Sequence, residues 1–234
     1  KQAFKLDEHY KPTVVAGCPP DAFAATGQLW GNPHYNWQHM MDTDFAWWKQ
    51  RFAKQFELYD IVRIDHFRGF AAYWEIPASA PTAEEQYGAK WVYGYGNELF
   101  SALHKTFGSA PIIAEDLGTI TPDVVELRKN NNYPGMKIMQ FGFESCNPED
   151  GFLPWNAEED FVIYTGTHDN DTTLGWYRSA PQHIKDFYHQ HINASNEHEA
   201  VWEMIRLGME SKAVLCITPL QDILVQGSEA RMNF

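Results

Sequence analysis

The fold is decided by a short stretch, Tyr59-Asp60-Ile61-Val62-Arg63-Ile64-Asp65, in which a mostly apolar run ends in an acid. Four later apolar runs lie at 111–116, 136–143, 161–169 and 213–218. As a group they are continuous in apolar character rather than alternating, which is typical of parallel strands buried on both faces. The sequence therefore predicts five strands of a parallel sheet.

Helical patterns separate these strands. The segments expected to be helical are 45–56, 98–107, a segment that starts at Pro122, 181–192 and 196–210. The candidate N-caps are Thr43 or Asp44, Asn97 and Thr121, and Gly108 is a stop signal. Strands that alternate with helices predict a parallel α/β architecture.

The spacing of the strands makes this prediction more specific. The strand ends fall near positions 65, 115, 142, 169 and 218, which are 50, 27, 27 and 49 residues apart. A (β/α)₈ TIM barrel averages about 30 residues per unit, with insertions in the loops above the strands. The predicted fold class is therefore α/β, an incomplete (β/α)₈ barrel that covers roughly its fourth to eighth strands. Five strands cannot close such a barrel, so we expect about three N-terminal strands and the segment after Phe234 to be missing.

Composition and charge exclude several classes of partner. The 234 residues are 44% hydrophobic, enough for one sizeable core, and 18 basic against 31 acidic residues give a net charge of −13. This charge disfavours nucleic acid and anionic membranes as partners, and no apolar run approaches a membrane span. The three cysteines, Cys18, Cys146 and Cys216, are too far apart for a disulfide framework, which predicts a reducing, cytoplasmic location.

Three of the predicted strands end in acids, namely Asp65, Glu115 and Asp169. In a parallel barrel the carboxyl ends of all strands face one mouth, so these acids are expected to converge there. Their mutual repulsion destabilises the fold, so such a cluster indicates catalysis or metal binding. Any one of these acids, taken alone, is more often a helix cap or a surface residue.

Glycoside chemistry is one use for such acids. A retaining enzyme needs a carboxylate nucleophile and a protonated carboxyl about 5–5.5 Å apart, and a third acid can bind sugar hydroxyls. Arg63 lies two residues before Asp65 on the same strand face, so its guanidinium can hold that acid in its ionised form. Asp65-His66 and His168-Asp169 also suit a metal site, so a metal-dependent barrel hydrolase is an alternative.

Seven motifs carry a resemblance to a known family. In chain order they are GCPPDAF at 17–23, GQLWGNP at 27–33, VRIDHFRGF at 62–70, IAEDLG at 113–118, PGMK at 134–137, YTGTHDNDT at 164–172 and GSEARMN at 227–233. With these motifs the chain resembles the 4-α-glucanotransferases of glycoside hydrolase family 77, called amylomaltase in bacteria and disproportionating enzyme in plants. The motifs follow the family's order and span nearly the whole chain.

The resemblance implies a retaining double displacement in a (β/α)₈ barrel, without metal or organic cofactor. Asp65 matches the family's nucleophile, Glu115 its general acid/base and Asp169 its transition-state stabiliser. The resemblance also implies substrate-binding positions, which are Asp21, Phe23, Gln28, Trp30, Arg63, His168 and Asn233. Residues 1–40 are expected to form an active-site loop region and 41–234 the βα units of the catalytic barrel portion, without the family's N-terminal strands and inserted subdomain.

The predicted function is therefore that of a glycosyltransferase. It would transfer an α-1,4-glucan segment from a maltooligosaccharide or starch-like donor to the 4-hydroxyl of another glucan or glucose. The preference for this acceptor over water comes from the resemblance alone. An α-1,4-glucan hydrolase and a non-catalytic glucan-binding fragment are the alternatives.

Overall fold

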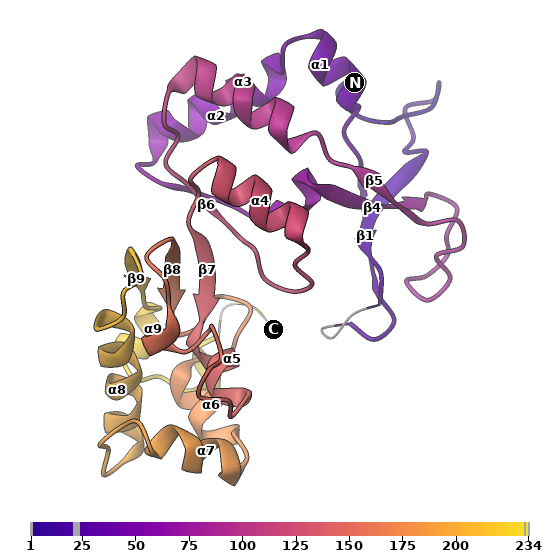
Figure 1. Cartoon of the computed structure of the whole chain (residues 1–234). Coiled ribbons are helices and arrows are strands. Elements are labelled where there is room, and N and C mark those ends of the chain that lie inside the picture. The colour runs from indigo at the N-terminus through magenta and orange to yellow at the C-terminus, as the bar shows by residue number, and fades with distance from the viewer. Residues whose placement is uncertain (1, 21–23, 232, 234) are drawn as a thin grey trace. The chain divides into compact units, whose positions relative to one another are not determined.

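The structure is a computed structural model, and it describes residues 2–20, 24–231 and 233. The chain forms two compact units, Lys1–Tyr133 and Pro134–Phe234 (Figure 1). Each unit contains parallel strands that are followed by helices, so the chain has the predicted α/β class. No helix in the described part of the chain is long and apolar enough to cross a membrane.

The first unit contains the parallel pair that the deciding stretch predicts. Strand β3 (Val62–Ile64) pairs with β6 (Ile112–Ala114) in a register that places Ile64 opposite Ala114. Both strands are shorter than the apolar runs that predicted them. The helices of this unit are α1 (Trp37–Asp42), α2 (Ala46–Leu58), the 3₁₀ helix η1 (Phe67–Phe70), α3 (Gly96–Phe107) and α4 (Pro122–Asn130).

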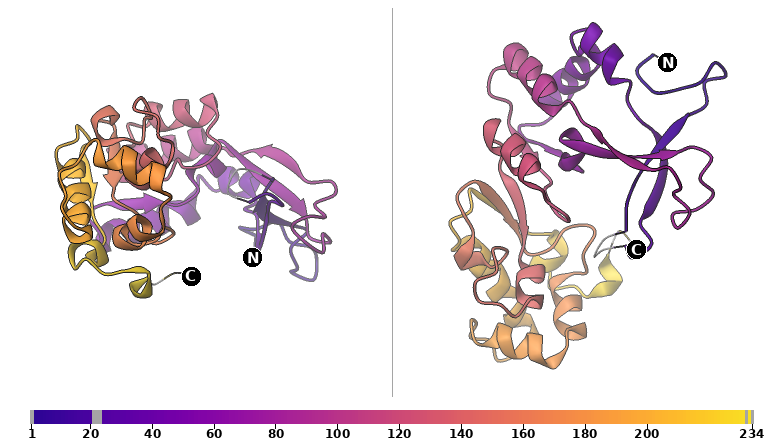
Figure 2. Two further views of the ribbon diagram at one scale, coloured as in Figure 1. Left: turned by 90° about the horizontal axis from the view of Figure 1, so that it is seen from below. Right: turned by 45° about the vertical axis from the view of Figure 1, so that its right-hand side comes forward.

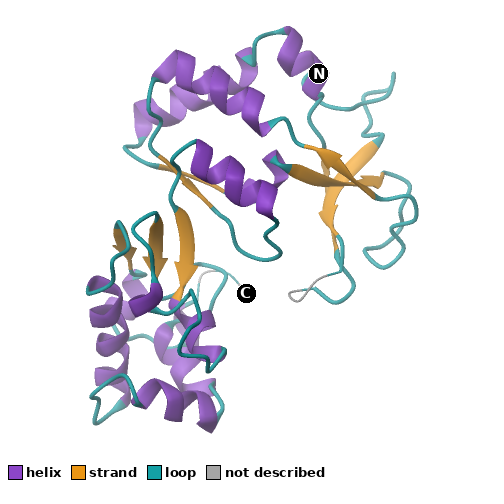
Figure 3. Ribbon diagram, in the orientation of Figure 1, coloured by secondary structure: helices purple, strands orange, loops and turns teal. Residues whose placement is uncertain are grey.

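An antiparallel sheet in the first unit was not predicted (Figure 3). Its strand order is β2-β1-β4-β5, with β1 at Val14–Cys18, β2 at Gln28–Pro33, β4 at Ala72–Pro77 and β5 at Lys90–Tyr93. The sequence signal is weak because glycine interrupts β1 and β2, and proline ends β2 and β4. Gly17 is required by packing, because a Cβ atom there would lie 2.2 Å from the carbonyl oxygen of Gln28 on the paired strand.

The core of the first unit is largely aromatic. Trp48, Phe52, Phe67, Phe70 and Phe100 are all buried in one cluster. Most of the aromatic excess in this unit therefore contributes to packing, as expected for rings of this size.

The helix starts differ from the predicted caps. Helix α2 begins after Phe45, which adopts a left-handed conformation with φ of 53°, and Thr43 instead donates its hydroxyl to the carbonyl of His39 at the end of α1. Helix α3 begins after Tyr95, also left-handed, rather than after Asn97. Thr121 does occupy the N-cap of α4, but its side chain makes no capping hydrogen bond.

The second unit is built on a three-stranded parallel sheet (Figures 1 and 2). Its order is β7-β8-β9, with β7 at Gly135–Ile138, β8 at Phe161–Tyr164 and β9 at Leu215–Ile217. The helices are α5 (Met139–Glu144), η2 (Pro154–Asn156), α6 (Thr173–Ser179), α7 (Gln182–His189), α8 (Glu197–Met209), α9 (Leu220–Ile223) and η3 (Ser228–Ala230). Helices α7 and α8 confirm the two predicted over 181–192 and 196–210.

One predicted strand in the second unit is wrong in its second half. The run 136–143 leaves the sheet after Ile138 and continues as helix α5. Met139 and Phe143, four residues apart, are both buried on one helical face. A continuous apolar run fits a buried strand and a buried helix equally well, so the pattern alone could not separate them.

Candidate functional site

Asp65 and Glu115 lie at the carboxyl ends of the paired strands β3 and β6. They directly follow Ile64 and Ala114, which are register partners, so the two acids leave the sheet at the same level. The main chains stay joined beyond the strands, because the amide of Phe67 donates to the carbonyl of Glu115 at 3.1 Å. The parallel pairing therefore brings together two of the three predicted acids.

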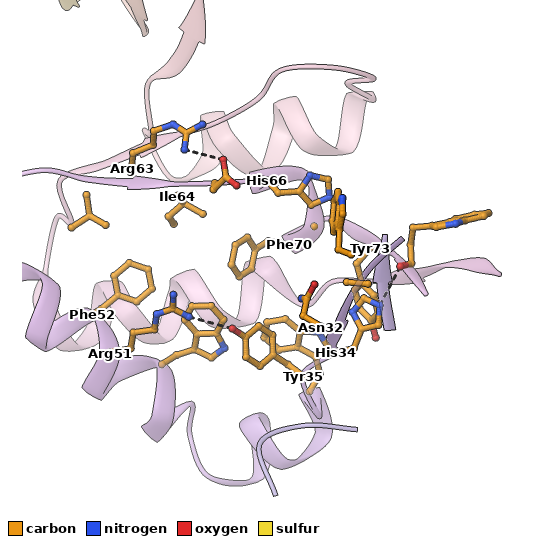
Figure 4. Close-up of a pocket in the computed structure, with 18 of the residues that line it drawn as sticks. Asn32, His34, Tyr35, Arg51, Phe52, Arg63, Ile64, His66, Phe70 and Tyr73 are labelled. Atoms are coloured by element: carbon orange, nitrogen blue, oxygen red, sulfur yellow. Dashed lines mark hydrogen bonds and ion pairs between the residues drawn. The ribbon is translucent and has the colours of Figure 1, made fainter. Parts of the chain in front are cut away.

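Asp65 is exposed and paired with a cation. Its side chain is 76% exposed, and Nη1 of Arg63 lies 2.8 Å from its Oδ1 (Figure 4). Since residues two apart on a strand share a face, Arg63 is positioned by the strand itself. One oxygen of Asp65 is therefore held by a charge-assisted hydrogen bond.

Glu115 is partly buried and bound by main-chain donors. The amide of Leu117 donates to its Oε1 and the amide of His66 to its Oε2, each at 2.8 Å. Burial raises the pKa of Glu115, and the charge of Asp65 adds to this, while the two amides and Arg63 lower it. The net direction is upward, which favours a carboxyl that holds its proton to higher pH than an ordinary glutamate.

His66 helps to shape this site through its backbone. It adopts a left-handed conformation with φ of 49°, and its amide is one of the two that bind Glu115. Burial lowers the pKa of its imidazole and the charge of Arg68 adds to the effect, so the ring favours its neutral form. Main-chain donors carry no side-chain signature, which is why His66 and Leu117 were not among the predicted site residues.

A cavity of about 540 Å³ opens beside Asp65 in the first unit (Figure 4). Arg63, Asp65, His66 and Trp30 line it together with Asn32, His34 and several aromatic rings. Charged groups, among them Arg51 on α2, alternate with aromatic rings in the wall, and such a lining suits a ligand with both hydroxyl groups and apolar C–H faces, such as a sugar. Asn32 and His34 had not been predicted.

Trp30 connects strand β2 to the site. Its ring lies 4.9 Å from the His66 ring, edge to face at 87°, and its Nε1 donates to Oε1 of Gln28 at 2.7 Å. The structure thus places Trp30 in the cavity wall, and Gln28 contacts it by this hydrogen bond. Asp21 and Phe23, the other predicted residues of this loop region, lie outside the described residues.

The second unit carries the third acid. Asp169 lies in the loop between β8 and α6, with its side chain 63% exposed. Nε2 of His168 lies 3.3 Å from its Oδ2, and Nδ2 of Asn233 donates to its Oδ1 at 3.0 Å. The structure therefore groups three predicted residues, Asp169, His168 and Asn233. Asn233 lies 64 positions after Asp169 in the chain.

A metal site is the alternative interpretation of the acids that follow the strands. Among residues 2–20, 24–231 and 233, no group of three or more His, Cys, Asp and Glu side chains is arranged to hold a metal ion. Asp65-His66 and His168-Asp169 thus do not belong to such a ligand cluster within the described residues.

The glycoside hydrolase family 77 model, described as 4-alpha-glucanotransferase, matches residues 1–234. This chain belongs to that family. The resemblance drawn from the seven motifs is therefore confirmed.

Individual relatives agree with the family model. The chain is 52% identical to a 4-alpha-glucanotransferase of Thermus thermophilus, with 99% of this chain and 47% of the relative covered. It is 47% identical to one of Streptococcus pneumoniae, with 99% and 45% covered. The chain thus spans about half the length of the curated relatives that it matches.

Solved structures show the same relation. An amylomaltase from Streptococcus agalactiae in complex with acarbose superposes with a TM-score of 0.93 at 37% identity, over 100% of this chain and 46% of that one. An amylomaltase from Corynebacterium glutamicum superposes with a TM-score of 0.74 at 16% identity, which is a likeness of fold.

Proposed function

We propose that this chain provides the catalytic carboxylates of a 4-α-glucanotransferase. The enzyme would transfer an α-1,4-glucan segment to the 4-hydroxyl of another glucan or of glucose. The observation that carries this proposal is the contrast between two neighbouring acids: Asp65 is exposed and paired with Arg63, whereas burial raises the pKa of Glu115. Two acids in such different environments are suited to the roles of nucleophile and proton donor.

The proposed first step cleaves the donor. A carboxylate oxygen of Asp65 attacks the anomeric carbon while Glu115 gives its proton to the leaving glycosidic oxygen. The products are a covalent glycosyl ester on Asp65, a shortened glucan with a new 4-hydroxyl, and an ionised Glu115. The adjacent Arg63 can hold the Asp65 oxygen that does not attack, and so orient the nucleophile.

The proposed second step reverses the roles. Glu115, now a base, takes the proton of an acceptor 4-hydroxyl, whose oxygen attacks the anomeric carbon and releases Asp65. Two displacements at one carbon restore the α configuration. The chemistry needs no metal or organic cofactor, so we expect activity to persist in the presence of a chelator.

The remaining predicted residues would bind and orient the glucan. Asp169 would stabilise charge and ring distortion in the transition state, with His168 and Asn233 as its neighbours. Gln28, Trp30 and Arg63 would contact the sugars from the first unit, and Asp21 and Phe23 would extend this surface. The donor and the acceptor would both be maltooligosaccharides or longer α-glucans.

We also propose that the parallel strands belong to one (β/α)₈ barrel. Strands β3, β6, β7, β8 and β9 would be its fourth to eighth strands, with residues 1–40 as the active-site loop region and 41–234 as βα units. Support comes from the parallel pairing within each unit and from the acids that follow β3, β6 and β8.

The decisive experiment is incubation of the full-length protein that carries these residues with maltotriose, followed by chromatography of the products. We expect glucose together with a ladder of longer maltooligosaccharides. Glucose and maltose without longer products would instead indicate a hydrolase. Absence of products with retained binding of maltooligosaccharides would indicate a glucan-binding protein and would overturn the proposal.

A further inference from the structure

A buried carboxylate that the proposed mechanism does not use lies in the second unit. Asp222, on α9, is 1% exposed. Its Oδ2 accepts hydrogen bonds from the hydroxyls of Thr165 and Thr173, at 2.6 and 2.7 Å, and its Oδ1 accepts from the amide of Thr173 at 2.7 Å. Removing a carboxyl group from water is unfavourable, so these three short contacts are what make its burial possible.

The partners of Asp222 are the two ends of the loop that carries Asp169. Thr165 directly follows β8, and Thr173 is the first residue of α6. Both are buried, with exposures of 0% and 1%. One carboxylate therefore joins the start and the end of the loop, which sets how far apart they lie and in which direction the loop leaves the sheet.

The same C-terminal segment contacts the middle of the loop. The hydroxyl of Ser228 donates to Oδ2 of Asp171 at 2.6 Å, and Asn233 donates to Asp169 itself. Together with Asp222, these residues hold the loop at positions 165, 169, 171 and 173. No other described strand-end acid of the proposed site is held in this way, since Glu115 is bound by main-chain amides.

The segment that bears Asp222 has an unusual backbone. Val225, just after α9, has φ of 52°, a left-handed conformation that is unfavourable for a β-branched residue. Its amide donates to the carbonyl of Asp222 at 3.0 Å. Such strain persists only where the surrounding contacts impose it, and it is concentrated near functional sites.

We infer that Asp222 is a positioning residue, which acts through Thr165 and Thr173 to place Asp169 for catalysis. The inference rests on the proposed function, because it depends on the role proposed for Asp169. Asp222 touches no reacting atom in this scheme. It would affect the rate only by fixing the loop, and a misplacement of about 1 Å can lower a rate by about 100-fold.

The test uses Thr165→Val and Thr165→Ser in the full-length protein. Valine has nearly the shape of threonine but cannot donate to Asp222, whereas serine keeps the hydroxyl. We expect Thr165→Val to lower kcat for maltotriose disproportionation about 10-fold to 100-fold with a smaller change in KM, and Thr165→Ser to restore most of the rate. Asp222→Asn provides a second variant, expected to lower kcat in the same range, should valine perturb folding.

A structural role that does not act through Asp169 predicts a different result in a double mutant. We expect Thr165→Val to lower kcat by less than about 2-fold when Asp169 is already Asn, because the loop then positions nothing that the rate depends on. An equal loss in both backgrounds would overturn the inference, as would unchanged kcat in both Thr165→Val and Asp222→Asn.

The inference can also be tested apart from activity. Hydrogen exchange of the amides in 165–173 should be faster in Thr165→Val than in Thr165→Ser, with α7 unchanged in both. We call the contacts of Asp222 with Thr165 and Thr173 the clamp. Full turnover by Asp169→Asn would contradict the proposed role of Asp169 without testing the clamp. Unchanged exchange in 165–173 would mean that the clamp itself has failed.

Discussion

The two regions that carry the proposed acids hold them by different means. In the first unit Glu115 is bound by two main-chain amides, from His66 and Leu117, at the ends of paired strands. In the second unit Asp169 lies on a loop whose shape depends on side chains, among them Asp222 and Asn233. The position of Glu115 is set by strand pairing, and that of Asp169 by hydroxyl, amide and carboxyl groups of side chains.

This difference teaches where each region tolerates substitution. An amide is present whatever the side chain, so the hydrogen bonds to Glu115 survive most substitutions at His66 and Leu117. The bonds around Asp169 are lost when a particular threonine, serine or asparagine is replaced. We therefore expect changes near Glu115 to act mainly through Glu115 itself, and changes near Asp169 to act also through the side chains that support it.

The largest effect is expected for Asp65→Asn, which removes the proposed nucleophile. Turnover of maltotriose should fall about 10⁴-fold or more, as measured by product chromatography. The free energy of unfolding should change by less than about 0.5 kcal/mol, because the side chain is 76% exposed. Asp44→Asn is the matched control, since Asp44 is 82% exposed and paired with Lys49. Retained turnover in Asp65→Asn would show that Asp65 is not the nucleophile.

Glu115→Gln should have the next largest effect, about 10³-fold on maltotriose. The loss should be much smaller on maltosyl fluoride, whose leaving group needs little protonation. Equal losses on both substrates would argue against an acid role for Glu115. Glu57→Gln is the control, because Glu57 is exposed and belongs to a surface ion pair with Lys54.

The pH dependence of Glu115 follows from the direction of its pKa shift. A raised pKa in the folded protein means that the folded state keeps a proton which the unfolded chain loses near 4.5. The stability that this proton contributes is present below pH 4.5, and it is lost as the pH rises through the pKa that Glu115 has in the folded protein. Rates that require protonated Glu115 should fall over the upper part of the same pH range. Glu115→Gln should remove the loss of stability over this range, as measured by denaturant unfolding at several pH values.

Arg63→Met should lower kcat about 100-fold by removing the cation beside Asp65. The same substitution should change the pKa of Glu115. Since the charge of Arg63 lowers the pKa of Glu115, its removal should raise that pKa further and move the alkaline fall in rate to higher pH. A pH–rate profile measures this shift, and Arg206→Met, at an exposed ion pair of the second unit, should leave the profile unchanged.

The smallest effect is expected for Asn233→Ala, which removes one side-chain contact to Asp169 and leaves the clamp at Asp222 in place. The rate should fall about 10-fold, equivalent to about 1.4 kcal/mol, with no change in melting temperature because the residue is exposed. Asn193→Ala is an exposed control on the same unit. A loss as large as that of Asp65→Asn would contradict this ranking and would show that Asn233 does more than support Asp169 and bind the glucan.

Much of the site could be predicted from local sequence. The runs before Asp65 and Glu115 indicated parallel strands, and the acids at their ends indicated a cluster for catalysis or metal binding. Helices α7 and α8 were predicted because their patterns lie within one short segment. The family followed from motifs such as VRIDHFRGF, which depend on residue identity and not on shape.

Other features could not be predicted because they depend on distant residues. Helices α2 and α3 begin after left-handed Phe45 and Tyr95, which make no side-chain capping hydrogen bond and pack in or against the aromatic core. The antiparallel partners of β1 are β2, which is near in the chain, and β4, which is distant. The periodicity of hydrophobic residues within one segment could not predict this pairing.

The sequence by itself thus determined the α/β class of the fold and the family, and it supplied the prediction that Asp65, Glu115 and Asp169 are the catalytic acids. Only the tertiary structure decided that Asp65 is exposed beside Arg63 and that Glu115 is partly buried with a raised pKa. It also brought Asp222 to Thr165, across 57 positions of chain. The physical reason is that residue type and spacing are local properties, whereas burial and hydrogen-bond partners are properties of the packed chain.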